Sequence, residues 1–169
     1  MRILFTLLCL MICLSSCKST KRDKIVTKKD YPEAETVNNK TSSKAEKIVT
    51  YAKTFEGVRY EFGGTTKRGM DCSGLVFTAF KHQNVLLPRI SRDMAKRGKR
   101  INLNEVTEGD LLFFKTNKRQ AKINHVGLVV STNKKNIEFI HSTTSKGVIT
   151  SLLSENYWNK AFIEARRVL

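Results

Sequence analysis

The chain has 169 residues, of which 31 are Lys or Arg and 15 are Asp or Glu, so its formal net charge is +16. This length favours one domain with a hydrophobic core, and 40% apolar residues exclude a wholly disordered chain. No apolar run reaches the roughly 18 residues that a membrane-spanning helix needs. So strong a positive charge would ordinarily indicate nucleic-acid binding first, but the beginning of the chain favours another interpretation.

The first residues have the pattern of a secretion signal. Arg2 supplies a positive charge, Ile3–Leu14 is apolar apart from one threonine, and small residues lead to Cys17. The apolar block is too short to span a membrane as a helix. The run LSSC resembles the lipobox of bacterial lipoproteins, whose cysteine is lipidated and becomes the mature N-terminus. We therefore expect residues 1–16 to be a signal peptide and Cys17 to carry lipid. The alternative is an ordinary signal peptide with an incidental Cys17.

The four cysteines then have separate fates. Cys9 and Cys13 leave with the signal, lipidation uses the thiol of Cys17, and Cys72 remains as a single free thiol. A single thiol cannot form a disulfide within the chain, and outside the membrane it risks oxidation, so its presence indicates a chemical role. For an exported protein, the expected partners of the positive charge are acidic headgroups and carboxylate-bearing wall polymers. No nucleic-acid partner is expected.

A polar segment separates the signal from the folded part. Residues 17–42 contain Cys17 and a stretch rich in Lys, Thr, Ser, Asn and Glu with almost no apolar side chains. Such a segment cannot bury enough surface to fold and is expected to be a flexible basic tether. A lipid chain and a tether would anchor the protein to a membrane without spanning it. The folded domain is expected over residues 43–169.

In the expected domain, helices come first and strands follow. Ser43 and Glu46 have the spacing of a capping box, and apolar residues recur at helical spacing up to Gly57. A short extended segment over 58–65 leads to a largely buried helix from Cys72 to about Lys81. A short helix is expected over 91–98, and strands over 111–114, 123–130, 137–141 and 148–152. Helices that precede sequential strands predict an α+β domain with a mainly antiparallel sheet.

Cys72 occupies the first position of its predicted helix, and Asp71 is suited to be the N-cap. The unpaired N–H groups and the helix dipole at this position favour an anion, which predicts a lowered pKa for the thiol. The carboxylate of Asp71 opposes that effect unless capping engages it. A thiolate is the nucleophile of cysteine enzymes, so the position favours catalysis. The alternative is a buried cysteine that acts as a small apolar residue.

Two of the three histidines, His125 and His141, lie at ends of consecutive predicted strands. Antiparallel partners are about 5 Å apart, so the imidazole of His141 could hold that of His125. A base and an orienting group beside a thiol form the triad of a cysteine peptidase. The alternatives are two structural histidines, or a Cys/His zinc site, for which the usual short ligand spacings are missing.

Six short motifs occur in an order that resembles a known family. They are YEFGG at 60–64, DCSGL at 71–75, LPR at 87–89, GDL at 109–111, NHVG at 124–127 and IHS at 140–142. The set resembles the NlpC family of papain-like cell-wall cysteine peptidases over about residues 43–169. Within that family the chain is most similar to lipoproteins that are murein DD-endopeptidases. The resemblance implies a papain-like α+β core and peptidoglycan as the substrate.

The resemblance also implies roles for single residues. Cys72 corresponds to the nucleophile, His125 to the general base and His141 to the residue that orients the base. Tyr60 matches a tyrosine that contributes to the oxyanion site. The implied chemistry is acyl transfer through a thioester, for which no metal or cofactor is expected.

The substrate contacts and the bond that is cut are less directly implied. Ser73 and Arg89 match positions near the family's cleft and are expected to bind substrate, while Ile90 departs from the small polar residue that is frequent there. Cleavage of the D-Ala–diaminopimelate cross-link is the expectation, and of the γ-D-glutamyl–diaminopimelate bond the alternative. A non-catalytic wall-binding lipoprotein and an acyl transferase stay open. The expected location is the outer membrane, facing the periplasm, and a regulatory protease or adaptor is a partner that the sequence leaves unassigned.

Overall fold

The computed structural model describes residues 42–117, 122–133 and 136–169. The expected signal peptide, the expected lipidation site at Cys17 and nearly all of the expected tether lie outside these residues. All described residues belong to one compact unit. Among them, no helix combines the length and the apolar character needed to cross a bilayer.

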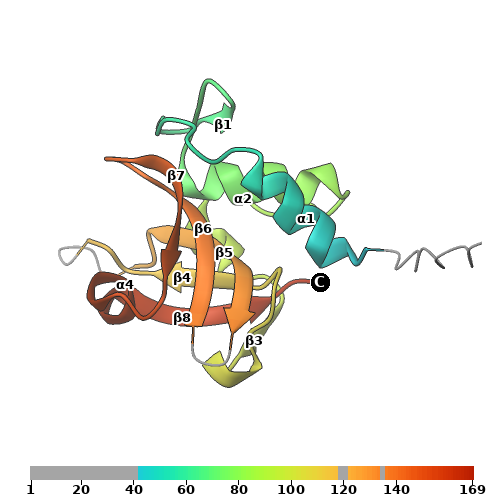
Figure 1. Ribbon diagram of the computed structural model, residues 1–169, viewed down its shortest axis with the longest axis vertical. Coiled ribbons are helices and arrows are strands. Elements are labelled where there is room, and N and C mark those ends of the chain that lie inside the picture. Colours follow the sequence, from blue (N-terminus) through green and yellow to red (C-terminus); the bar gives the residue numbers. More distant parts are fainter. Residues whose placement is uncertain (1–41, 118–121, 134–135) are drawn as a thin grey trace, which may run out of the picture. The chain divides into compact units, whose positions relative to one another are not determined.

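The described residues form a six-stranded antiparallel sheet with the order β3-β8-β4-β5-β6-β7 (Figure 1). Its strands are β3 (Lys99–Ile101), β4 (Leu111–Phe114), β5 (His125–Asn133), β6 (Asn136–Thr143), β7 (Gly147–Leu152) and β8 (Phe162–Arg167). The predicted α+β class with a mainly antiparallel sheet is therefore confirmed.

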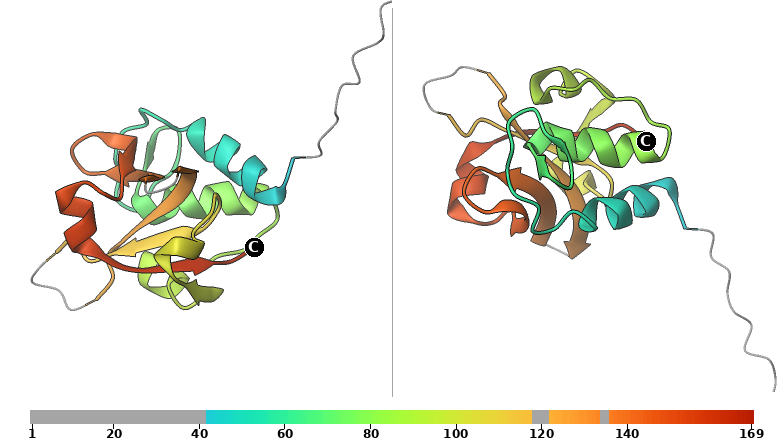
Figure 2. Two further views of the ribbon diagram at one scale, coloured as in Figure 1. Left: turned by 60° about the horizontal axis from the view of Figure 1, so that its bottom comes forward. Right: turned by 90° about the horizontal axis from the view of Figure 1, so that it is seen from above.

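Helices cover the sheet from both sides. The described helices are α1 (Lys44–Lys53), α2 (Cys72–His82), the single turn α3 (Ser91–Met94), the 3-10 turn η1 (Leu103–Glu105) and α4 (Asn156–Ala161). α1 and α2 lie side by side on one face, where Leu75 of α2 shares a buried cluster with Phe113 of β4 (Figures 1 and 2). On the other face, Trp158 of α4 packs in a second cluster with Phe114. Because both faces are covered, β4 is buried along its whole length.

The first helix starts where the sequence predicts and ends earlier. Ser43 Oγ accepts a hydrogen bond from the Glu46 N–H at 3.1 Å, and α1 begins at the next residue after Ser43. The helix ends at Lys53 rather than near Gly57, because hydrogen-bonded turns follow it and bring Phe55 into the core. A small hairpin that the sequence did not predict, β1 (Thr65–Thr66) and β2 (Gly69–Met70), then precedes α2.

The start of α2 matches the prediction and depends on a glycine. Asp71 is the N-cap, and its Oδ1 accepts a hydrogen bond from the Gly74 N–H at 2.6 Å. A Cβ on Gly74 would collide with the carbonyl oxygen of Gly64. The loop can therefore approach the first turn of α2 only because position 74 is glycine, and this approach shapes the surroundings of Cys72.

The C-terminal part differs most from the expectations. The helix expected over 91–98 is only the single turn α3, and the sequence had indicated no element for β3, α4 or β8. β8 lies between β3 and β4, inside the sheet, although its sequence FIEARR contains three charged residues. The structure accommodates these charges by pairing: Arg166 Nε lies 2.8 Å from Glu164 Oε1, and Arg167 Nη2 lies 2.7 Å from Asp110 Oδ2.

Candidate active site

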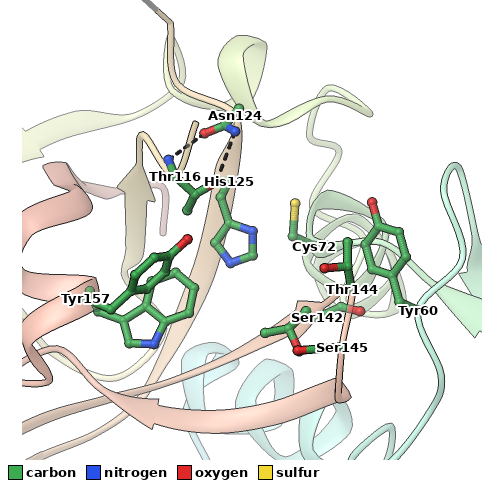
Figure 3. Close-up of a pocket in the computed structure, with 11 residues that line it drawn as sticks. Tyr60, Cys72, Thr116, Asn124, His125, Ser142, Thr144, Ser145 and Tyr157 are labelled. Carbon is green, nitrogen blue, oxygen red and sulfur yellow. Dashed lines mark hydrogen bonds between the residues drawn. The ribbon is translucent and has the colours of Figure 1, made fainter. Parts of the chain in front are cut away.

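A cavity of about 360 Å³ opens where the start of α2 faces the starts of β5 and α4 (Figure 3). It is lined by Tyr60, Cys72, Thr116, Asn124, His125, Ser142, Thr143, Thr144, Ser145, Tyr157 and Trp158. Three residues of the predicted site, Tyr60, Cys72 and His125, are therefore brought together in one cavity. The fourth, His141, lies directly behind His125.

Cys72 and His125 lie opposite each other across this cavity, on α2 and β5 respectively (Figure 3). Both are buried, and the backbone N–H of Val126, next to the predicted base, acts to lower the pKa of the Cys72 thiol. The predicted nucleophile therefore lies against the first residues of β5, the strand that carries the predicted base.

His141 holds the ring of His125 from behind. Because β5 and β6 are neighbours in the sheet, His125 Nε2 lies 3.0 Å from His141 Nδ1, with the two rings nearly perpendicular at 88°. This contact uses Nε2 of His125 and leaves Nδ1 for the thiol. Within the described residues, no group of three or more His, Cys, Asp or Glu side chains is arranged to hold a metal ion.

Trp158 covers both histidines on the side away from α2. Its ring stacks on His125 with centroids 5.2 Å apart and an interplanar angle of 22°, and it meets the ring of His141 edge-on at 4.5 Å. Sequence patterns predict no role for Trp158 in the site. Because it is the chain's single tryptophan, composition could have drawn attention to it, but only the tertiary fold brings α4 onto β5 and β6.

Two hydrogen-bonded clamps fix the backbone on either side of the cavity. Asn124 accepts from the Thr116 N–H at 2.8 Å and donates to the Thr116 hydroxyl at 3.0 Å, which ties the segment before His125 to the end of β4 (Figure 3). Ser142 donates from its hydroxyl to the Met70 carbonyl at 2.7 Å, which ties β6 to the segment before α2. The first clamp therefore fixes the backbone next to His125, and the second fixes the backbone next to Cys72.

Burial sets the protonation states of the site. It lowers the pKa of His125 from 6.5 to about 4, and it lowers the pKa of His141 to about 3, so both imidazoles are neutral near neutral pH. Burial also raises the pKa of the Cys72 thiol, and the negative charge of Asp71 acts in the same direction. The lowered thiol pKa predicted from the helix start is therefore wrong for this structure, because desolvation outweighs the N–H groups around the sulfur. The site rests as a thiol beside a neutral imidazole.

The predicted substrate-binding residues form a network around Asp71. Arg89 donates from Nη2 to Asp71 Oδ2 at 2.8 Å and from Nη1 to Asp71 Oδ1 at 2.9 Å, while the hydroxyl of Ser73 donates to Oδ1 at 3.1 Å. Burial alone would raise the pKa of Asp71, but Arg89 and the N–H groups of Gly74 and Gly63 outweigh it and hold that pKa below 3.8. Neither Ser73 nor Arg89 lines the cavity, and their binding of substrate stays a prediction.

Tyr60 stands beside the start of α2 because its backbone forms a bridge with that of Met70. Burial raises the pKa of Tyr60, and the neighbouring Cys72 and Asp71 raise it further. The phenol therefore stays protonated and can donate a hydrogen bond into the cavity.

Comparison with known proteins places this site in a family. Residues 57–167 match the NlpC/P60 family. The chain belongs to the NlpC/P60 family. The match includes the start of α2, the beginning of β5 and all of β6 and β7, so it contains every element that builds the site.

The chain is 41% identical over 116 residues to the murein DD-endopeptidase MepS/murein LD-carboxypeptidase of Escherichia coli, covering 68% of this chain and 58% of that protein. It is 36% identical over 124 residues to a γ-D-glutamyl-L-lysine dipeptidyl-peptidase of Bacillus subtilis, covering 73% and 40%. The crystal structure of an NlpC/P60 family protein from Bacillus cereus has a TM-score of 0.66 and 27% identity, covering 74% of this chain and 40% of that one. The chain spans a little more than half the length of the curated murein endopeptidase relatives that it matches.

Proposed function

We propose that this protein is a peptidoglycan endopeptidase that hydrolyses D-Ala–diaminopimelate cross-links between stem peptides. The observation that carries the proposal is the order of three groups: Cys72 at the start of α2, His125 opposite it, and His141 bonded to His125 at 3.0 Å. This is the order of nucleophile, base and orienting group in a cysteine peptidase. The name of the E. coli relative supports the substrate class.

The mechanism starts from the neutral thiol and imidazole. Nδ1 of His125 takes the proton of Cys72 as the sulfur attacks the carbonyl carbon of the scissile amide. The C–N bond then breaks, His125 returns the proton to the leaving amine, and a thioester remains on Cys72. Water, deprotonated by His125, attacks the thioester, releases the carboxylic acid and restores the thiol.

The negative charge on the substrate oxygen needs donors fixed before the reaction. The backbone N–H of Cys72 lies at the first position of α2, where N–H groups have no partner within the helix. The protonated hydroxyl of Tyr60 lines the same cavity and is the second donor of the proposed oxyanion site.

The charge of the cavity favours the cross-link over the substrate of a dipeptidyl-peptidase. Among the described lining residues none is Asp, Glu, Lys or Arg, and most of the wall consists of hydroxyl-bearing residues such as Thr143, Thr144 and Ser145. A dipeptidyl-peptidase releases a dipeptide from a free N-terminus, whose ammonium group is best held by a carboxylate. A bond within a cross-link brings no terminal ammonium, so an uncharged wall suits it.

The direct test digests purified sacculi with the full chain in detergent and identifies the products by mass spectrometry. Conversion of cross-linked dimers to monomers by the wild type, and none by a folded Cys72→Ala variant, is the expected result. An unchanged profile with the wild type, or equal activity of the variant, would overturn the proposal. Cleavage at the γ-D-glutamyl bond would favour the alternative peptidase, and new amides formed with an added amine would indicate a transferase.

The proposed location follows from the N-terminal sequence. Lipid on Cys17 and the basic tether would hold the enzyme at the outer membrane, facing the periplasm and within reach of the wall. Metabolic labelling with palmitate tests the anchor: label is expected on the wild type and not on Cys17→Ser. Label on both would place the lipid elsewhere, and label on neither would remove the anchor from the proposal.

A further inference from the structure

A fourth polar side chain continues the line of catalytic groups into the core. Ser151 of β7 places its hydroxyl oxygen 3.1 Å from His141 Nε2, on the side of the ring away from His125. β6 and β7 are paired neighbours, and Ser151 lies directly across from Phe139 in their register. Both His141 and Ser151 are buried, at 0% and 8% exposure, so water does not readily replace this contact.

The hydrogen-bond capacity of a neutral imidazole limits how the two histidines can bond. Each neutral ring has one N–H donor and one unprotonated nitrogen that can accept a hydrogen bond. In one arrangement His125 donates from Nε2 to Nδ1 of His141, which leaves Nδ1 of His125 bare and able to take the thiol proton. In the other arrangement His141 donates from Nδ1, so His125 carries its proton on Nδ1 and cannot act as a base toward Cys72. Only the first arrangement is competent.

In the competent arrangement, Nε2 of His141 needs a hydrogen-bond acceptor. With Nδ1 accepting, the proton of His141 is on Nε2, and a buried N–H without an acceptor is costly. Ser151 Oγ stands where that acceptor is needed. We propose that Ser151 is a positioning residue that keeps the proton of His141 on Nε2, and thereby keeps His125 able to accept the proton of Cys72. This inference rests on the proposed function, and it goes beyond the predicted triad by one residue.

The sharpest test is a pair of variants with nearly the same shape. Ser151→Thr keeps the hydroxyl and Ser151→Val replaces it with a methyl group, while both are β-branched and suit a strand. We expect Ser151→Thr to stay within about twofold of the wild-type kcat/KM and Ser151→Val to lose about three- to tenfold, mostly in kcat, as for loss of one hydrogen bond. Thr150→Ala removes a hydroxyl from an exposed neighbour on the same strand and is expected to have no effect.

A second measurement reads the tautomer without any substrate. Nitrogen NMR of labelled imidazoles should find the proton of His141 on Nε2 in the wild type and in Ser151→Thr, and a shift of population to Nδ1 in Ser151→Val. Ser151→Ala serves the same purpose if the valine does not fold. In a His141→Ala background the valine should cause no further loss of activity, since Ser151 acts through His141.

The two proposals fail in different ways. An inactive wild type would overturn the proposed function, and the NMR measurement would still decide the role of Ser151. If the wild type is active and Ser151→Val matches Ser151→Thr in kcat/KM with an unchanged His141 tautomer, the positioning role is refuted. A loss of activity in Ser151→Val that persists in the His141→Ala background would refute it as well, because the serine would then act by another route.

Discussion

Cys72, the proposed nucleophile, lies beside the carboxylate of Asp71, and the residues around that carboxylate limit its effect on the thiol. Asp71 accepts two hydrogen bonds from Arg89 as well as those from the backbone N–H groups of Gly63 and Gly74. A negative charge next to Cys72 disfavours a thiolate, whereas a charge paired with a guanidinium does so less. The ion pair is therefore part of what allows a cap residue and a reactive cysteine to be neighbours.

Replacing Arg89 tests this pairing. Arg89→Gln leaves Asp71 with a partly buried, unpaired charge and should lower the free energy of unfolding by about 1–3 kcal/mol, a range reduced for partial exposure. It should also slow alkylation of Cys72, because the uncompensated carboxylate opposes the thiolate. Urea unfolding and iodoacetamide rates measure the two effects. Arg92→Gln, at an exposed arginine nearby, is the matched control, and equal behaviour of the two variants would contradict the pairing role.

The low pKa of His125 predicts an unusual acid limb in the pH–rate profile. Protonation of both ring nitrogens would inactivate His125 as the proposed base, and burial lowers its pKa to about 4. The kcat/KM of the free enzyme should therefore fall with a midpoint near 4 instead of near the ordinary 6.5. Circular dichroism at each pH separates this effect from unfolding. A midpoint near 6.5 in a folded enzyme would show that the ring is more hydrated than its burial indicates.

At the scale of single elements, local signals predicted the start of α2 well. Asp71 before an apolar run is a cap signal that depends on only a few neighbouring residues, and the helix begins at Cys72 as expected. The strands β4 to β7 were also recognisable, since their apolar residues cluster between turn residues. His125 and His141 were expected to meet because consecutive strands usually pair.

The parts that were missed depend on contacts between distant segments. β8 contains charged residues, and Asp110, the partner of Arg167, is far away in the sequence, so the pattern of β8 does not resemble a buried strand. The environment of His141 depends on Trp158 and Ser151, which reach it from α4 and β7. Desolvation of Cys72 is likewise a property of the assembled core. No local pattern reports this desolvation, so the helix start alone predicts the wrong direction for the thiol pKa.

One glycine of β5 links strand packing to the site. A Cβ on Gly127 would collide with the ring of Phe139, which packs against His141 with centroids 4.7 Å apart. Gly127→Ala should therefore lower the free energy of unfolding by about 1–3 kcal/mol and reduce activity by moving His141. Phe139→Leu in the same chain should restore part of both losses, because the smaller side chain makes room. Simple addition of the two single-variant losses, measured by urea unfolding and sacculus digestion, would argue against the clash.

For the whole molecule, the two buried histidines predict a loss of stability in mild acid. In the unfolded chain they titrate near 6.5, whereas burial lowers their folded pKa values to about 4 and about 3. Below pH 6.5 the unfolded state binds protons that the folded state does not bind. The free energy of unfolding is therefore highest above pH 6.5 and falls as the pH decreases toward 4. The slope approaches about 1.4 kcal/mol per pH unit for each histidine.

Urea unfolding at pH 7, 6 and 5 measures this loss directly. His141→Gln removes one of the two groups and should reduce the dependence on pH by about half, even if its stability at pH 7 is lower. A free energy of unfolding that is constant between pH 7 and pH 5 in the wild type would mean that the histidines are protonated equally in both states.

The position of β8 has a consequence for when the protein can fold. β8 inserts between β3 and β4, so the sheet is incomplete until a strand that is synthesised after all the others has joined it. Until β8 has been synthesised, β3 lacks its one partner among the described strands, and β4 is an edge strand of the sheet. Pairing over such sequence separations is slow. The nascent domain should therefore stay open until translation has passed β8, and its two buried clusters can close only after that strand has joined the sheet.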